Sequence, residues 1–169
     1  MSDLQEPDTR RTRTVTWEDP LPAARAGRKM SGIEYLRAIG AGTFPPPPIG
    51  VLLGMLPVEV SEGRAVFAVK PAEFHYNPIG VVHGGLAATL LDSAMGCAVQ
   101  TMLPAGTGYT TVEIKVNYIR PLTVETGEVR AEGTVIHSGG RIATAEGRLV
   151  DQSGKLYAHA TTTCIILRP

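Results

Sequence analysis

The chain has few cysteines and no excess of charge of either sign, and both shortages narrow its class. Its 169 residues include two cysteines, Cys97 and Cys164, and both lie in apolar runs. We expect both to be reduced core residues rather than parts of a disulfide framework. Reduced cysteines are typical of cytoplasmic proteins, so we predict a cytoplasmic location. Sixteen Lys and Arg residues balance sixteen Asp and Glu residues. The net charge therefore favours neither nucleic acid nor an anionic membrane as a partner.

Several catalytic signatures are also missing. The chain contains no Gly-x-Ser-x-Gly nucleophile elbow, no Gly-x-Gly-x-x-Gly dinucleotide fingerprint and no Walker A loop. Its four histidines form no His-Glu-x-x-His motif, and its cysteines lack the paired spacing of a zinc site. We therefore expect no bound metal.

One apolar run, from Leu86 to Leu103, approaches the length of a membrane span. It is at the short end of the roughly 20 residues that a span requires, and it contains Asp92 and Gln100. A core helix is the better interpretation. Arg10-Arg11 resembles a twin-arginine signal, but a polar stretch follows where such a signal has an apolar region.

The length fits one domain with an appendage, and a hydrophobic fraction of 43% permits a core. We divide the chain into an arm at 1–30, polar and irregular to about Gly27, and a single domain at 31–169. Within the domain, Ser31 and Glu34 form a capping-box pattern that predicts a short helix ending at Gly40. Pro45 to Pro48 predicts an extended connector.

The rest of the chain alternates between strand patterns and one long helical segment. The helix is predicted from Gly84 to Met102, after a loop. Within one strand the side chains of Val112, Ile114, Val116 and Tyr118 are expected to share a face. Since one helix cannot cover two sheet faces, we predict an α+β fold in which a single curved antiparallel sheet wraps the helix. The predicted strands are Val51–Val60, Arg64–Lys70, Thr110–Ile119, Gly127–His137, Arg141–Asp151 and Leu156–Ile166.

The stretch NPIGVVHGGLAATLLD, from Asn77 to Asp92, carries the strongest chemical signal. Asp92 is the one charged residue between Gly84 and Leu103. A carboxylate in such a run needs a partner or a function. The glycine pair Gly84-Gly85 at a helix start lets a ligand carbonyl approach free backbone N–H groups where the helix dipole is positive. Asp92, two turns on, then acts on the polarised carbon, an arrangement suited to attack on an activated acyl group.

This stretch resembles the hotdog-fold acyl-CoA thioesterases of the PaaI type. In that family an Asn, a His-Gly-Gly and an Asp or Glu follow one another at the spacing of Asn77, His83-Gly84-Gly85 and Asp92. The likeness continues in TTVEIKVNYIRPL, from Thr110 to Leu122, and in the segment 137–163, and it covers roughly 51–167. It implies the hotdog fold, in which an antiparallel sheet wraps a long central helix.

The resemblance also implies roles for individual residues. Asp92 is implied to be the nucleophile or the general base, and the two stay open. The Gly84 N–H is implied to polarise the thioester oxygen. Asn77 is implied to position the water or the acyl group. His83 either bonds the loop backbone or contacts the substrate.

One hydroxyl and one phosphate-binding edge complete the predicted site. Thr111 is the position implied for a family hydroxyl beside the acid, with Thr110 as the near alternative. Gly96 departs from the family, because some members carry a hydroxyl one turn after the acid. The Gly-rich turn Ser138-Gly139-Gly140-Arg141, with Arg120, predicts a phosphate-binding edge, and a plain hairpin turn remains the alternative.

The leading interpretation is an acyl-CoA thioesterase that hydrolyses an aromatic or medium-chain thioester, with CoA as part of the substrate and no separate cofactor. A hotdog hydratase or dehydratase and a non-catalytic acyl-CoA sensor are the alternatives. The resemblance further implies a homodimer or homotetramer whose sites are shared between subunits. Candidates for the acyl pocket are the apolar residues Val51, Leu53, Met55, Met95 and Met102.

Overall fold

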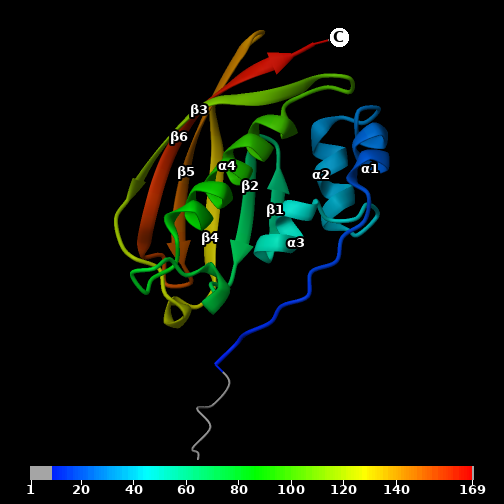
Figure 1. Ribbon diagram of the computed structural model, residues 1–169. Coiled ribbons are helices and arrows are strands. Elements are labelled where there is room, and N and C mark those ends of the chain that lie inside the picture. The colour runs from blue at the N-terminus through cyan, green and yellow to red at the C-terminus, as the bar shows by residue number, and fades with distance from the viewer. Residues whose placement is uncertain (1–8, 169) are drawn as a thin grey trace, which may run out of the picture.

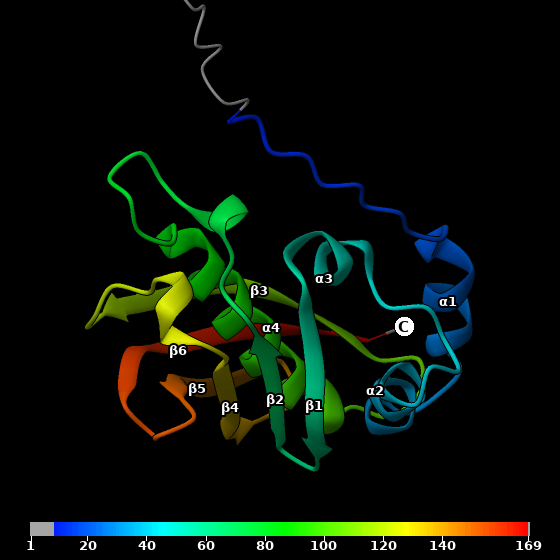
Figure 2. The same cartoon turned by 90° about the horizontal axis from the view of Figure 1, so that it is seen from below.

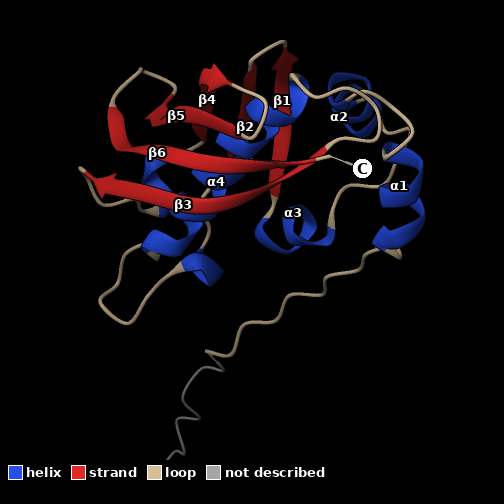
Figure 3. Ribbon diagram, turned by 90° about the horizontal axis from the view of Figure 1, so that it is seen from above, coloured by secondary structure: helices blue, strands red, loops and turns tan. Residues whose placement is uncertain are grey.

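Six antiparallel strands form one sheet in the computed structural model, which describes residues 9–168. The strands follow the spatial order β1-β2-β4-β5-β6-β3, so β1 and β3 are the two edges (Figure 3). Their bounds are β1 Met55–Ser61, β2 Arg64–Val69, β3 Gly108–Tyr118, β4 Val129–Ser138, β5 Ile142–Asp151 and β6 Leu156–Leu167. The predicted α+β class and single antiparallel sheet are confirmed.

The long helix α4, Gly84–Thr101, lies across one face of this sheet (Figure 1). Its fully buried side chains, among them Leu90, Leu91 and Met95, form the centre of the core. The helix approaches β4 so closely that a Cβ added at Gly133 would lie 2.4 Å from the backbone of Ala94. Glycine at that position therefore permits the packing that gives the hotdog arrangement its shape.

Strand β3 departs from the predicted alternation at a β-bulge between Thr111 and Glu113. Thr111 pairs with Cys164, and Ile114 pairs with Thr162, both of which are buried. The bulge inserts an extra residue and shifts the alternation by one position. Thr111 and Ile114 therefore lie on the same face although they are three positions apart, and the unbroken alternation predicted along this strand is wrong at the bulge.

Two helices occur where the sequence predicted none. Helix α1, Pro20–Gly27, begins at Asp19, whose side chain accepts a hydrogen bond of 2.9 Å from the Leu21 N–H. Asp-Pro at a helix start is an N-cap followed by a proline preset for the first turn, so a signal was present. Residues 1–8 of the expected irregular arm lie outside the described residues.

Helix α3, Pro48–Leu53, replaces the start of the predicted strand Val51–Val60. Pro48 occupies the first helical turn, and Gly54 ends the helix in the left-handed conformation at φ 68°. Six residues are too few to display a helical period, which explains the error. The capping box of α2, Gly32–Gly40, is confirmed, with Ser31 and Glu34 bonded reciprocally.

Part of the arm lies on the body of the domain. The Arg13 guanidinium donates hydrogen bonds to the carbonyls of Val51 and Leu52 and lies 3.9 Å from the ring centroid of Phe74. Phe74 belongs to a 3₁₀ turn, η1, Glu73–His75, and a second turn, η2, spans Val124–Thr126. Figure 2 shows α1, α2 and α3 on the β1 side of the sheet. The division at residue 30 stays a prediction.

Candidate active site

The start of α4 leaves one backbone donor without a partner. His83 caps the helix: its Nδ1 accepts from the Gly85 N–H at 2.8 Å, and its carbonyl accepts from the Leu86 N–H at 3.0 Å. The N–H of Gly84, the residue directly after His83, has no acceptor in the part of the chain that the structure describes. This N–H therefore remains a donor at the positive end of the helix dipole.

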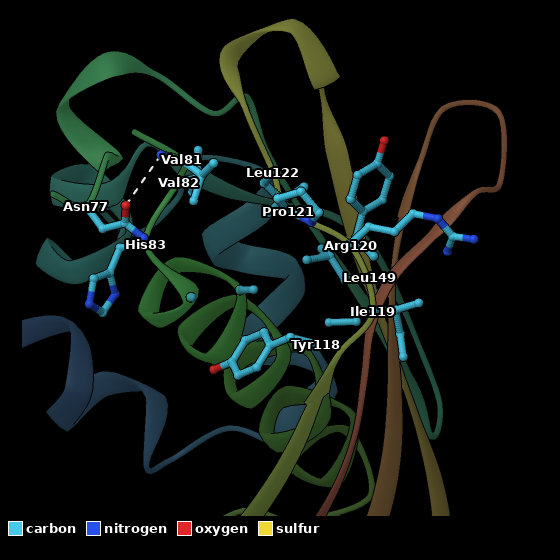
Figure 4. Close-up of a pocket in the computed structure, with 14 residues that line it drawn as sticks. Asn77, Val81, Val82, His83, Tyr118, Ile119, Arg120, Pro121, Leu122 and Leu149 are labelled. Atoms are coloured by element: carbon cyan, nitrogen blue, oxygen red, sulfur yellow. Dashed lines mark hydrogen bonds between the residues drawn. The ribbon is translucent and has the colours of Figure 1, made fainter. Parts of the chain in front are cut away.

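Asn77 is held by its own loop in a way that leaves its amide N–H groups available. Its Oδ1 accepts from the Ile79 N–H at 3.0 Å and from the Val81 N–H at 3.4 Å (Figure 4). Such short-range bonds fix the side chain as a turn-forming Asn. Within residues 9–168 its Nδ2 has no bonded acceptor.

Asn77, His83 and Gly84, which we call the loop half of the site, line one cavity of about 340 Å³ (Figure 4). Tyr118, the last residue of β3, and Arg120, just beyond it, line the same cavity, and the Tyr118 ring lies close to Gly84. The cavity therefore combines two unpaired N–H donors with a cation, a set of groups that suits a carbonyl ligand carrying negative charge nearby.

A buried histidine that the sequence analysis did not single out anchors this loop. His75 is 7% exposed, its Nδ1 accepts from the Ala72 N–H at 3.0 Å, and its Nε2 donates to the Leu53 carbonyl at 3.1 Å. Its own carbonyl accepts from the His83 N–H at 2.8 Å. Burial lowers the pKa of His75, and the positive charge of Arg13 lowers it further. The neutral ring therefore ties α3 to the loop half.

Asp92 and Thr111, which we call the helix half of the site, are in direct contact. The Thr111 hydroxyl donates a hydrogen bond of 3.0 Å to Asp92 Oδ1. The neighbouring Thr110 is exposed, so Thr111 is the threonine beside the acid. Asp92 is only partly buried, and it faces strand β3. Its second oxygen, Oδ2, has no bonded partner in the described chain.

Tyr109 is a second residue beside the acid that sequence reasoning missed. A Cβ added at Gly96, one turn after Asp92, would lie 2.5 Å from the Tyr109 hydroxyl. The phenol therefore fills the place of a side chain at position 96, where some family members carry a hydroxyl. Burial raises the pKa of Tyr109 well above its usual range, and the charge of Asp92 adds to this, so the phenol stays protonated.

The two halves lie apart within one chain. Gly84 and Asp92 are both on α4, and at a rise of about 1.5 Å per residue their backbones are roughly 12 Å apart along the helix. The cavity that Asn77, His83 and Gly84 line does not include Asp92 or Thr111. One chain thus presents a set of donors in one place and a carboxylate in another.

The expected phosphate-binding edge is also divided. Arg120 lies beyond Tyr118 and donates a 2.5 Å hydrogen bond to the Leu156 carbonyl, at one end of the sheet. The turn at Ser138-Gly139-Gly140-Arg141 lies at the other end, where β5 begins at Ile142 and pairs with Ile165. A single chain therefore does not bring Arg120 to this turn.

Arg168 takes the place beside the turn that Arg120 was expected to fill. Its guanidinium lies next to Gly140, and both line a cavity of about 460 Å³ together with Ser138 and Gly139. The position of Arg168 near the chain end gave no signal, because strand pairing alone brings it to the turn. Of the five acyl-pocket candidates, Met55 and Met95 are buried in the core, and the acyl-pocket role of all five stays a prediction.

The structure also bears on metal ligands, membrane spans and cysteine pairing. Within residues 9–168, no three His, Cys, Asp or Glu side chains come together as a metal-binding group. None of the helices in the described chain is long and apolar enough to cross a membrane. Cys97 and Cys164 are both free thiols.

Comparison with known proteins adds independent findings. A family model described as the thioesterase superfamily matches residues 79–158. Human acyl-coenzyme A thioesterase 13 is 30% identical over 108 residues, which cover 63% of this chain and 75% of that protein. The candidate esterase SSO2140 of Saccharolobus solfataricus is 32% identical over 111 residues, covering 66% of this chain and 77% of the relative. Two other curated relatives are matched over just 56% and 57% of their lengths.

Solved structures show the same architecture. A mutant of the phenylacetic acid degradation protein PaaI from Thermus thermophilus superposes with a TM-score of 0.64 at 30% identity, covering 73% of this chain and 100% of that one. The part of the present chain that the family model leaves out includes α1, α2 and α3.

Proposed function

The chain belongs to the thioesterase superfamily, and from this premise we propose that it hydrolyses acyl-CoA thioesters, of aromatic or medium-chain acids, to the free acid and CoA. One structural observation supports this proposal in addition to family membership. The unpaired N–H of Gly84 and the unpaired amide of Asn77 line one cavity, at a helix N-terminus that favours negative charge. A thioester oxygen that becomes negative in the transition state is the ligand that such donors stabilise.

The acid supplies the second part of the chemistry. Thr111 donates to one oxygen of Asp92 and leaves the other free to accept a proton or to attack. As a general base, Asp92 takes a proton from water while the water oxygen bonds to the acyl carbon. The C–S bond then breaks, and the CoA thiolate leaves and is protonated. As a nucleophile, Asp92 forms an anhydride that water cleaves afterwards. Both routes need the same free oxygen.

The separation of the two halves supports a site shared between subunits. A general base must lie within hydrogen-bond reach of its proton, directly or through one water, and the loop half and helix half of one chain are about 12 Å apart along α4. Strand β3 is an open edge whose side chains Val112, Ile114 and Tyr118 are 51%, 36% and 57% exposed. Edge-to-edge pairing of two β3 strands would satisfy their backbone groups and cover these side chains. We therefore propose a homodimer, or a homotetramer built from it.

Assembly also accounts for the divided phosphate edge. Arg120 at the loop half, and the turn at Ser138-Gly139-Gly140-Arg141 with Arg168, supply guanidinium groups and backbone N–H groups that suit CoA phosphates. We propose that different subunits contribute them to one CoA. The hydratase alternative needs a histidine that exchanges protons with the substrate, and it is disfavoured because the His83 Nδ1 already accepts from the Gly85 N–H at the start of α4.

A thiol-release assay tests the proposal most simply. The purified chain is incubated with a panel of acetyl-, hexanoyl-, decanoyl-, benzoyl- and phenylacetyl-CoA, and released thiol is followed with a chromogenic disulfide. The proposal predicts turnover of at least one panel member, abolished in Asp92→Asn. Binding of acyl-CoA without thiol release would instead support a non-catalytic sensor, and water addition to an enoyl-CoA would support a hydratase.

A further inference from the structure

An extended segment before α1, residues 9–19, which we call the strap, lies against the C-terminal end of α3. It runs past that helix in both Figure 1 and Figure 3. The Arg13 guanidinium donates to the Leu52 carbonyl at 2.6 Å and to the Val51 carbonyl at 3.1 Å. The last carbonyls of a helix have no partner inside it, and Arg13 supplies donors for two of them.

The same guanidinium contacts an aromatic ring beside the loop half. It lies 3.9 Å from the centroid of the Phe74 ring, and that ring meets the His75 ring edge-on, with the two centroids 4.2 Å apart. The His75 Nε2 in turn donates to the Leu53 carbonyl at 3.1 Å. Three consecutive carbonyls at the end of α3 therefore receive side-chain donors from Arg13 and His75, and Phe74 contacts both of these side chains.

The loop half is tied to His75 because the loop closes at that residue. The His75 carbonyl accepts from the His83 N–H at 2.8 Å, and the Asn77 N–H donates to the Val81 carbonyl at 2.8 Å. These bonds close a loop that carries Asn77 and ends directly before Gly84. The position of His75 therefore sets the position of both donors of the loop half.

A second contact holds the same loop. The Val82 N–H donates to the Leu122 carbonyl at 2.9 Å, in the segment after β3. This bond alone would leave the Asn77 end of the loop unfixed. The contacts of His75 with α3 and with Phe74 fix that end, and Arg13 connects them to the strap.

We propose that Arg13 is a positioning residue, which holds the loop half through Phe74 and His75 in the geometry that hydrolysis needs. The proposal rests on the thioesterase function above and adds a residue to its site. Arg13 does not line the cavity of the loop half, so it acts through other residues. The strap and α3 precede the segment 79–158 that the family model matches, so family membership does not imply this role.

Hydrogen exchange tests this hold without reference to activity. Arg13→Gln removes the guanidinium, and Arg25→Gln on α1 is the matched control, because Arg25 is exposed and its side chain has no partner within residues 9–168. In Arg13→Gln the amides of Asn77 and His83 should exchange about tenfold faster, whereas the amides of α4 and of the sheet should keep their wild-type rates. Wild-type exchange rates at these two loop amides would overturn the proposal, whatever the activity.

Kinetics test whether the hold matters for the reaction. Because the loop half supplies donors to the transition state, Arg13→Gln should lower kcat about tenfold on the best thioester of the panel and change KM less than about twofold. Arg25→Gln should match the wild type. Arg13→Lys keeps a positive charge but not the fork that reaches two carbonyls, so its kcat should lie between those of the wild type and Arg13→Gln. The same kcat in Arg13→Gln and Arg25→Gln would overturn the proposal.

A double-mutant cycle tests the route through Phe74. Phe74→Leu keeps an apolar side chain but removes the ring that Arg13 and His75 contact. Combined with Arg13→Gln, it should lower kcat little further than the more damaging single change, whereas additive losses would overturn this route. Faster loop exchange in Arg13→Gln without turnover of any thioester by the wild type would refute the proposed function and retain the hold. Unchanged exchange with wild-type turnover would retain the function and refute the hold.

Discussion

The loop half and the helix half of the proposed site differ in which hydrogen-bonding groups they leave free. In the loop half the acceptors are occupied, because Asn77 Oδ1 and His83 Nδ1 both receive backbone N–H groups, and the donors at Asn77 Nδ2 and Gly84 N remain. In the helix half the donor is occupied, because the Thr111 hydroxyl is bonded to Asp92, and a carboxylate oxygen remains. One half can stabilise a developing negative charge, and the other can accept a proton or attack.

This difference explains why neither half suffices for hydrolysis. Donors alone bind a carbonyl without supplying a base, and a carboxylate alone meets a carbonyl that nothing polarises. The two halves also differ in how they are held. The loop half depends on the buried ring of His75 and on the cap of α4, whereas the helix half is fixed by α4 packing and by the pairing of β3 with β6.

The largest effect is expected from removing the carboxylate of the helix half. Asp92→Asn keeps the shape and the Thr111 hydrogen bond but removes the charge, so kcat should fall at least about 100-fold. Melting temperature and subunit mass should stay near those of the wild type. Near-normal turnover in a folded variant would assign Asp92 a structural role.

Removing one donor of the loop half should have a comparable or somewhat smaller effect. Replacing Gly84 by glycolic acid through semisynthesis turns its N–H into an ester oxygen, and kcat should fall by about 100-fold with little change in KM. The same exchange at Gly85 is the matched control, because the Gly85 N–H is bound to His83 and its loss should lower stability more than kcat. Equal kinetic effects at both positions would contradict the assignment.

Acidification should loosen the loop half selectively. The pKa of His75 lies below its usual value of 6.5 in the folded state, so the unfolded chain binds more protons in acid. The stability that the neutral ring contributes is full above about 6.5 and is lost as the pH falls toward the folded pKa. The His75→Asn variant should have a lower melting temperature than the wild type at pH 7.5, and its melting temperature should fall less than that of the wild type on acidification to pH 5. If the melting temperatures of the wild type and the variant fall equally with pH, His75 is not the cause of the pH dependence of stability.

Much of the fold was predictable because its signals are local. The capping box at Ser31, the long apolar segment with glycines at its start, and the Gly-containing turns between strands each specify an element without knowledge of its neighbours. The errors arose where a few residues decide the structure: the six residues of α3 show no period, and the bulge after Thr111 shifts the alternation by one position.

The site was predictable in its residues and less so in its geometry. The spacing of Asn77, His83, Gly84 and Asp92 pointed to one stretch, and the structure adds which hydrogen-bonding atoms of that stretch stay free. Tyr109 and Arg168 carried no local signal. Tyr109 reaches its place through the pairing of β3 with β6, and Arg168 through the pairing of β5 with β6.

The most direct test of the account is complementation between the two halves. Asn77→Ala and Asp92→Asn chains, each inactive alone, are mixed in equal amounts under conditions that allow subunit exchange, which native mass spectrometry verifies. If the site is shared, half of the dimers are mixed and each carries one intact site, so about a quarter of wild-type activity should return. Verified exchange without any return of activity, or a light-scattering mass of one chain for the active protein, would contradict the shared site.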